Sequence, residues 1–125
     1  MNLLPAITVS TTDRDRLFAV LDNFKGDSDQ IDYLYDELAR ANIVDENDIP
    51  EGVVTLGSRA RFRNDATGKE HERVLTLPGE TQTVSDAISI LTPAGAALLG
   101  LKTGDDIQWP HEGHFLHLRL LNVTR

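Results

Sequence analysis

Residues 87–109, AISILTPAGAALLGLKTGDDIQW, contain a short helix whose two ends are both marked in the sequence. Thr92 can cap its start, and Pro93 suits its first turn. Gly100 suits the position just past its end, where the backbone often takes a positive φ. Apolar runs flank the helix on both sides, so its alanines and leucines are expected to pack against a sheet.

Short apolar or alternating segments, bounded by turn residues, surround this helix and predict strands. They lie at Val53–Leu56, Arg59–Arg63, Arg73–Leu77, Asp86–Leu91, Ile107–Trp109 and Phe115–Val123. One short helix among several strands, with no βαβ repeat, indicates an α+β domain with a mostly antiparallel sheet.

The first 45 residues show helical spacing instead, after a possible strand at Ile7–Val9. Thr12, with Asp15 three residues later, resembles a capping box and predicts that a helix begins there. Its apolar stripe runs to residue 24 and is broken at Lys25-Gly26. The first helix is therefore expected over residues 12–24.

A second apolar stripe at helical spacing covers residues 31–41, and Asp27 or Ser28 can cap this helix. Because only a few residues separate the two stripes, the helices should form a short, coiled-coil-like antiparallel hairpin. Asp27 and Asp29 would lie at its tip. Each helix of about 13 residues would span only about 20 Å.

An acidic, proline-containing connector at Asp45–Gly52 separates the two patterns. We therefore expect residues 1–45 to form a short strand and an acidic helical hairpin, and residues 46–125 to form the α+β domain. The length of 125 residues fits one compact domain with a small appendage.

Negative charge is concentrated in the N-terminal part of the chain. Residues 11–51 carry 12 acidic and 4 basic side chains, whereas residues 52–125 carry 8 of each, which gives the formal net charge of −8. This balance argues against direct nucleic-acid recognition, which requires a basic surface. The acidic hairpin is either an ordinary solvated surface or a probe for a basic partner or a bound metal.

The absence of cysteine excludes disulfides and thiolate chemistry. No apolar run reaches the roughly 20 residues needed to span a membrane, and the first residues lack the basic segment of a secretory signal. We expect a cytoplasmic monomer that does not bind membranes.

Three histidines, His111, His114 and His117, recur at a spacing that superficially suggests a metal site. His111 and His114 are expected in a loop that contains Pro110, Glu112 and Gly113, and His117 is expected in a strand. The three side chains would therefore not share one face. We expect neither a metal nor a cofactor here.

Arg59, Arg61 and Arg63 alternate with Ala60 and Phe62, which places three guanidinium groups on one face of a strand. They could meet phosphate or carboxylate, or they could pair with neighbouring glutamates on a solvent-exposed face. Nowhere do a nucleophile, a base and an orienting residue combine, so an enzyme is not expected.

The carboxylates at the hairpin tip, Asp27 and Asp29, also have two interpretations. They could contribute to a Mg²⁺ site held by another protein, because Mg²⁺ prefers oxygen ligands. Simple helix capping would explain the same residues, and Ser28 with them.

Three phrases within residues 89–105 resemble the Gre elongation-factor superfamily: Ser89–Pro93, Ala96–Gly100 and Gly104-Asp105. Together they fit the pattern I-S-x-x-[ST]-P-x-G-x-A-L-L-G-x-x-x-G-D, and the likeness extends upstream to VVTLGSRARFRN at 53–64. The run Gly95–Leu101 and the short hairpin resemble the Rnk branch, whose name stands for regulator of nucleoside diphosphate kinase.

The resemblance implies an FKBP-like C-terminal domain and docking at the rim of the secondary channel of bacterial RNA polymerase. The positions that correspond to the polymerase contacts of Gre proteins are Ser89, Leu91 and Pro93. Leu91 stands where some relatives have an acidic residue, so an apolar contact is expected there.

Gre factors, by the same resemblance, place acidic tip residues beside the catalytic Mg²⁺ of the polymerase and stimulate transcript cleavage. Their hairpin is considerably longer than one of about 20 Å. We therefore expect competition for the docking site without cleavage stimulation. The family name also implies an influence on nucleoside diphosphate kinase.

Two other functions remain open on the sequence. An FKBP-like fold is shared with prolyl isomerases and chaperones, although such an isomerase needs an aromatic-lined pocket, and beyond residue 52 the aromatics are Phe62, Trp109 and Phe115. The chain could also be a general interaction module, dimeric through apolar surface of the hairpin.

Overall fold

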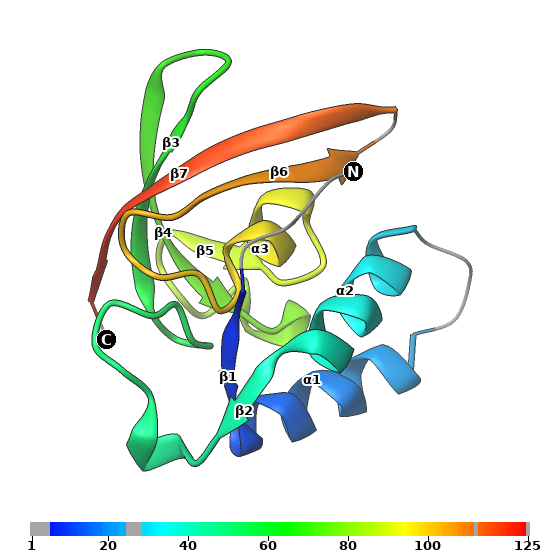
Figure 1. The fold of residues 1–125 in the computed structure, drawn as a ribbon. Helices are drawn as coiled ribbons and strands as arrows, with labels where there is room; N and C mark the ends of the chain where they lie inside the picture. The colour runs from blue at the N-terminus through cyan, green and yellow to red at the C-terminus, as the bar shows by residue number, and fades with distance from the viewer. Residues whose placement is uncertain (1–5, 25–28, 112, 125) are drawn as a thin grey trace.

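The computed structural model describes residues 6–24, 29–111 and 113–124. A curled sheet of five strands wraps around the short helix α3 (Pro93–Leu98), and helices α1 (Thr11–Asp22) and α2 (Asp29–Arg40) lie to one side (Figure 1). The strands of this sheet are β3 (Arg59–Asn64), β4 (Lys69–Thr76), β5 (Ala87–Ser89), β6 (Asp106–His111) and β7 (His114–Thr124). The predicted α+β class is therefore confirmed.

The strand order in the sheet is β5-β4-β3-β7-β6. The pairs β3–β4, β3–β7 and β6–β7 are antiparallel, and only the short edge strand β5 runs parallel to its neighbour β4. The pairing of β3 with β7 shifts register between Arg61 and Phe62, an irregularity of the kind that increases local bending of a sheet. The prediction of a mostly antiparallel sheet is confirmed.

Helix α3 has the ends that its sequence predicts. The Thr92 hydroxyl accepts a hydrogen bond from the Gly95 amide at 3.0 Å, and Pro93 occupies the first turn. Gly100 has a φ of +75°. Buried alanines and leucines of this segment fill the concave side of the sheet, where they pack with Trp109, which is fully buried.

One continuous core joins residues from both parts of the chain. Ile7, Leu17 and Leu34 belong to the same buried cluster as Leu98 and Trp109. The backbone amide of Thr8 donates to the carbonyl of Gly100 at 3.2 Å, and a Cβ at Gly100 would lie 2.6 Å from the Cβ of Ile7. Gly100 therefore both ends α3 and lets the first strand pass closely over it.

The start of α1 differs from the prediction. Ser10, not Thr12, is the cap, because its hydroxyl accepts a hydrogen bond from the Asp13 amide at 3.0 Å. The helix ends at Asp22, so Phe24 lies beyond it and is 40% exposed. The proposed caps of the second helix, Asp27 and Ser28, lie outside the described residues.

Val53–Leu56 is not a strand, contrary to the prediction. Val54 is buried, but its amide donates to the carbonyl of Leu101 and its carbonyl accepts from the Gly100 amide. Leu56 instead gives its amide to the carboxylate of Asp13. Val53 and Val54 are buried, and the backbone hydrogen bonds of Val54 and Leu56 go to the loop at Gly100–Leu101 and to Asp13, not to a strand of the sheet.

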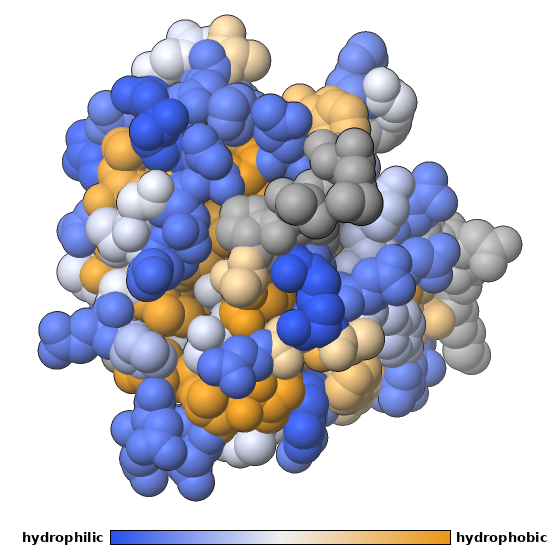
Figure 2. Space-filling view, in the orientation of Figure 1, coloured by the Kyte–Doolittle hydropathy of each residue, from blue (hydrophilic) through white to orange (hydrophobic). Residues whose placement is uncertain are grey.

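A second, two-stranded sheet pairs β1 (Thr8–Ser10) with β2 (Asn42–Val44) in parallel. The prediction of a strand near Ile7–Val9 was close, whereas β2 was not predicted. Ile43 and Val44 of β2 are half-buried. Figure 2 shows apolar side chains on this face of the molecule, in the region of β2. A three-residue strand is too short to produce a recognisable alternation.

Helices α1 and α2 contact each other through aromatic side chains. The rings of Phe18 and Tyr35 stack with centroids 6.0 Å apart, and the Tyr35 hydroxyl donates to the carboxylate of Asp22. That hydrogen bond raises the pKa of Tyr35. Within the described ranges, each helix falls well short of the length and apolar character that a membrane span requires.

Candidate functional site

The turn from β5 into α3 carries the three predicted docking residues, Ser89, Leu91 and Pro93, all half-buried. The carbonyl of Ser89 accepts hydrogen bonds from the Thr92 amide at 3.0 Å and from the Thr92 hydroxyl at 2.7 Å. The Ser89 hydroxyl accepts from the Leu91 amide at 3.1 Å. The polar groups of the turn are thus largely used within the turn, which holds its shape.

Gly95 allows this turn to close against the first turn of the helix. A Cβ at this position would lie 2.0 Å from the Ser89 carbonyl oxygen and 2.9 Å from the Thr92 hydroxyl oxygen. Any side chain would therefore push the β5–α3 turn away from α3. The G of the T-P-x-G phrase is required by this close approach.

A cavity of about 220 Å³ opens beside the turn, between the sheet and the start of α3. Ile88 and Ala94, which flank the docking residues in sequence, both line it. The full lining consists of Phe62, Asn64, His71, Arg73, Ile88, Ala94, Leu116 and Leu118. The cavity beside the turn is therefore mostly apolar, with three polar side chains, Asn64, His71 and Arg73.

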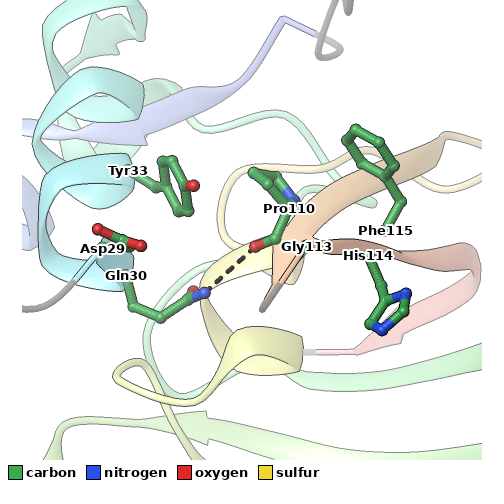
Figure 3. A pocket seen from close by; sticks show the side chains of 7 residues that line it. All are labelled: Asp29, Gln30, Tyr33, Pro110, Gly113, His114 and Phe115. Atoms are coloured by element: carbon green, nitrogen blue, oxygen red, sulfur yellow. Dashed lines mark hydrogen bonds between the residues drawn. The ribbon is translucent and has the colours of Figure 1, made fainter.

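Of the two predicted tip residues, the structure describes Asp29. It is the first residue of α2 and is exposed. Asp27 lies outside the described residues. Asp29 lines a cleft of about 370 Å³ between the start of α2 and the turn from β6 to β7 (Figure 3). The cleft is also lined by Gln30, Tyr33, Pro110, Gly113, His114 and Phe115. The structure therefore places the start of α2 against the C-terminal sheet.

The row of arginines on β3 is matched by carboxylates. Arg59 lies 3.4 Å from Asp86, Arg61 2.7 Å from Glu70 and Arg63 2.8 Å from Asp65. The hydrogen bonds that Arg61 donates to Glu70 raise the pKa of Arg61, and the hydrogen bond that Arg63 donates to Asp65 lowers the pKa of Asp65. The predicted pairing with neighbouring glutamates is confirmed for Arg61, and for Arg59 through Glu72 at 3.8 Å, whereas Arg63 pairs with an aspartate.

The histidines lie in strands, contrary to the expected loop for the first two. His111 ends β6 and His114 begins β7, and the two residues are paired between these strands. His117 lies farther along β7, with its Nε2 3.4 Å from Asp65 and 3.7 Å from Asp106. Among the described residues, no group of three or more histidines, aspartates and glutamates is arranged to hold a metal ion.

Asp13 is a buried carboxylate that the sequence alone did not single out. It is 6% exposed, and it accepts the Leu56 amide at 3.1 Å while lying 3.6 Å from Arg16. Burial raises the pKa of Asp13, which the hydrogen bond from Leu56 opposes. Asp13 thus joins the first turn of α1 to the segment that leads into the sheet. Its position three residues after the true cap was the available signal.

Glu37 is a second buried carboxylate, on α2, and it pairs with Arg40 at 2.8 Å. Burial raises the pKa of Glu37, while the hydrogen bond with Arg40 opposes that shift. Because Glu37 and Arg40 are three residues apart, they are neighbours on one helix face. The pair is part of the packing of α2 and is not a catalytic arrangement.

Comparison with known proteins divides the chain into two matched regions. Residues 49–125 match the family described as transcription elongation factor, GreA/GreB, C-terminal. Residues 5–44 match the family described as Rnk N-terminus.

Individual relatives agree with these matches. A regulator of nucleoside diphosphate kinase from Escherichia coli K12 is 35% identical over 121 residues, which are 95% of this chain and 89% of that protein. The transcription elongation factor GreA of Clostridium botulinum strain Hall is 34% identical over 88 residues, covering 70% of this chain and 55% of that protein. Among solved structures, a prokaryotic transcription elongation factor GreA/GreB from Nitrosomonas europaea aligns with a TM-score of 0.76 and 41% identity. The alignment covers 97% of this chain and 99% of the Nitrosomonas europaea chain.

Proposed function

Because the chain belongs to the GreA/GreB transcription elongation factor family, in its Rnk branch, we propose that this transcription-related regulator binds bacterial RNA polymerase at the rim of the secondary channel. The observation that carries the proposal is that both family regions are present in one chain, which aligns over 95% of its length with the Escherichia coli regulator. The relatives are described as a regulator and as elongation factors, which agrees with a protein that is not an enzyme.

The proposed contact surface is the β5–α3 turn, with Ser89, Leu91 and Pro93 facing the polymerase. Its support is a turn held in shape by its own hydrogen bonds, beside an apolar cavity that could receive a side chain of the partner. A rigid surface loses little conformational freedom on binding, which favours affinity. The half-buried Leu91 would supply an apolar anchor.

Leu91→Asp tests this surface. Burying a carboxylate in an apolar contact should weaken polymerase binding about thirtyfold, as expected for loss of a central contact of about 2 kcal/mol. The measurement is fluorescence-polarisation binding of the labelled protein to core polymerase, with a Gre factor as competitor.

Leu121→Asp is the matched control, because it introduces the same change at a half-buried position of β7 outside the core cluster. It should leave affinity within about twofold. Unchanged affinity of Leu91→Asp, or binding that a Gre factor does not displace, would count against the proposed docking site.

We infer that the first 45 residues form a short, coiled-coil-like antiparallel hairpin and that residues 46–125 form an FKBP-like domain. Helices α1 and α2 have 12 residues each, or about 18 Å. A hairpin of that length supports occupation of the channel entrance without approach of Asp27 or Asp29 to the catalytic metal. The protein should therefore compete with Gre factors and leave stalled transcripts uncleaved. Shortened RNA in a stalled-complex assay would refute this part.

Regulation of nucleoside diphosphate kinase, implied by the family name, would then follow indirectly from transcription in the cytoplasm, with the protein acting as a monomer. The prolyl isomerase alternative has less support, because Phe62 is the only aromatic residue other than His71 along the described cavity beside α3. Isomerisation of a model peptide above background would revive it.

A further inference from the structure

The cleft between α2 and the β6–β7 turn brings together residues about 80 positions apart in the chain (Figure 3). Tyr33 and Asp29 come from the start of α2, and Pro110 and Phe115 come from the paired strands opposite. Its volume of about 370 Å³ lies within the range of about 300–1,000 Å³ typical of ligand sites. The cleft is separate from the proposed docking turn, because none of Ser89, Leu91 and Pro93 lines it.

Gln30 holds the two walls of the cleft in place. Its side-chain oxygen accepts a hydrogen bond from the indole nitrogen of Trp109 at 2.7 Å, and its side-chain nitrogen donates to the carbonyl of Pro110 at 3.2 Å. The ring of Tyr33 meets that of Trp109 edge-on, with centroids 5.8 Å apart. Because Trp109 is fully buried, this arrangement fixes α2 to β6 and preforms the cleft.

The lining combines exposed aromatic surface with negative charge. Phe115 is 53% exposed, more than any other large apolar side chain of the described residues, of which Phe24 follows at 40%. Tyr33, half-buried, and Asp29, exposed, both line the cleft. The surrounding part of the sequence, residues 11–51, carries the whole net charge of −8.

We propose that this cleft is a binding site for an arginine side chain of a protein partner. A guanidinium group is planar and stacks on aromatic rings, while it also pairs with a carboxylate. Tyr33 and Phe115 supply the rings, and Asp29 supplies the carboxylate. A phosphate or an acidic side chain would be repelled by Asp29 and by the charge of the hairpin.

The proposal goes beyond polymerase docking at the β5–α3 turn, because it adds a second contact at a cleft that none of the docking residues lines. It holds for any partner that presents arginine at this cleft. A partner bound at both places would gain affinity from the two contacts together.

The test uses the full chain, labelled with ¹⁵N, and the peptide acetyl-Gly-Arg-Gly-amide. Titration should shift the side-chain amide of Gln30 and the indole N–H of Trp109, which is the only tryptophan of the chain. The same peptide with citrulline, which is neutral and nearly the same shape, should bind about tenfold more weakly, because it keeps the stacking and loses the ion pair.

Asp29→Asn and Phe115→Ala should each weaken binding of the arginine peptide severalfold. Asp32→Asn is the matched control, because Asp32 is an exposed carboxylate on the same helix that does not line the cleft. Thermal melting followed by circular dichroism checks that each variant is folded.

Equal binding of arginine and citrulline peptides, an equal loss in Asp32→Asn, or shifts confined to other residues would overturn the proposal. No polymerase is present in this experiment, so its failure leaves the docking proposal standing. Conversely, unchanged polymerase affinity of Leu91→Asp would leave the proposal of an arginine-binding cleft standing.

Discussion

Replacement of Gly95 by alanine should distort the turn that carries the proposed docking residues. The Cβ of alanine would lie 2.0 Å from the carbonyl oxygen of Ser89 and 2.8 Å from its carbonyl carbon. Both are backbone atoms, so neither can rotate away as a flexible side chain could. Either α3 or the turn must therefore move.

The expected loss in the free energy of unfolding is about 2–3 kcal/mol. Alanine has the higher helix propensity, which alone would stabilise a helix by about 1 kcal/mol. Overpacking against a rigid neighbour costs about 1–3 kcal/mol, here at the upper end because the contact is with backbone. Loss of the hydrogen bond between the Thr92 hydroxyl and the Gly95 amide adds about 1 kcal/mol. The clash therefore outweighs the propensity.

Urea unfolding followed by circular dichroism measures this loss. With a urea dependence of about 2 kcal/mol per molar, the midpoint should fall by about 1–1.5 M. Gly79→Ala is the matched control, since no atom lies within 4 Å of its added Cβ and its φ is not positive. A midpoint for Gly95→Ala equal to that of the wild type, or equal shifts for both variants, would refute the reasoning.

Two further predictions concern the first turn of α1. Ser10→Ala removes the cap of the Asp13 amide and should lower the free energy of unfolding by about 1 kcal/mol in urea unfolding, whereas Thr12→Ala should cost less; equal costs would contradict the assignment of the cap. Burial raises the pKa of Asp13 above the unfolded value near 3.8, so the folded protein holds the carboxyl proton more tightly than the unfolded chain does. The stability gained in this way is fully present below the unfolded pKa and is lost as pH rises through the folded pKa. Asp13→Asn lacks this titration, so its stability relative to the wild type should increase from pH 4 to pH 7; a difference that stays constant or decreases would contradict the raised pKa.

Sequence and structure agree best where the deciding chemistry is local. Thr92, Pro93 and Gly100 mark the ends of α3 because a hydroxyl cap, a fixed φ and a positive φ each act within one helical turn. The same holds for the alternation that placed β3 and its row of arginines. The partner of Arg61, Glu70 on β4, could not be assigned in advance, because strand register decides which side chains of β3 and β4 lie near each other.

Predictions failed where an apolar segment or a hydroxyl side chain had more than one possible hydrogen-bond partner. Val53–Leu56 has the composition of a strand, yet its backbone pairs with the loop at Gly100–Leu101 and with Asp13. The cap of α1 was predicted at Thr12 and is Ser10. Both are hydroxyl residues that can cap a helix, and the end of β1 at Ser10 decides between them.

The sequence by itself determined the α+β class, the short helix between Thr92 and Gly100, and the location of the negative charge in the first half of the chain. Only the tertiary structure decided that α2 lies against β6 and that Asp29, Tyr33 and Phe115 share a cleft. The physical reason is that caps and periodicity act over a few residues, whereas the bonds of Gln30 to Trp109 and Pro110 join groups about 80 residues apart. Such pairs are chosen by the packing of the whole core, which no local pattern records.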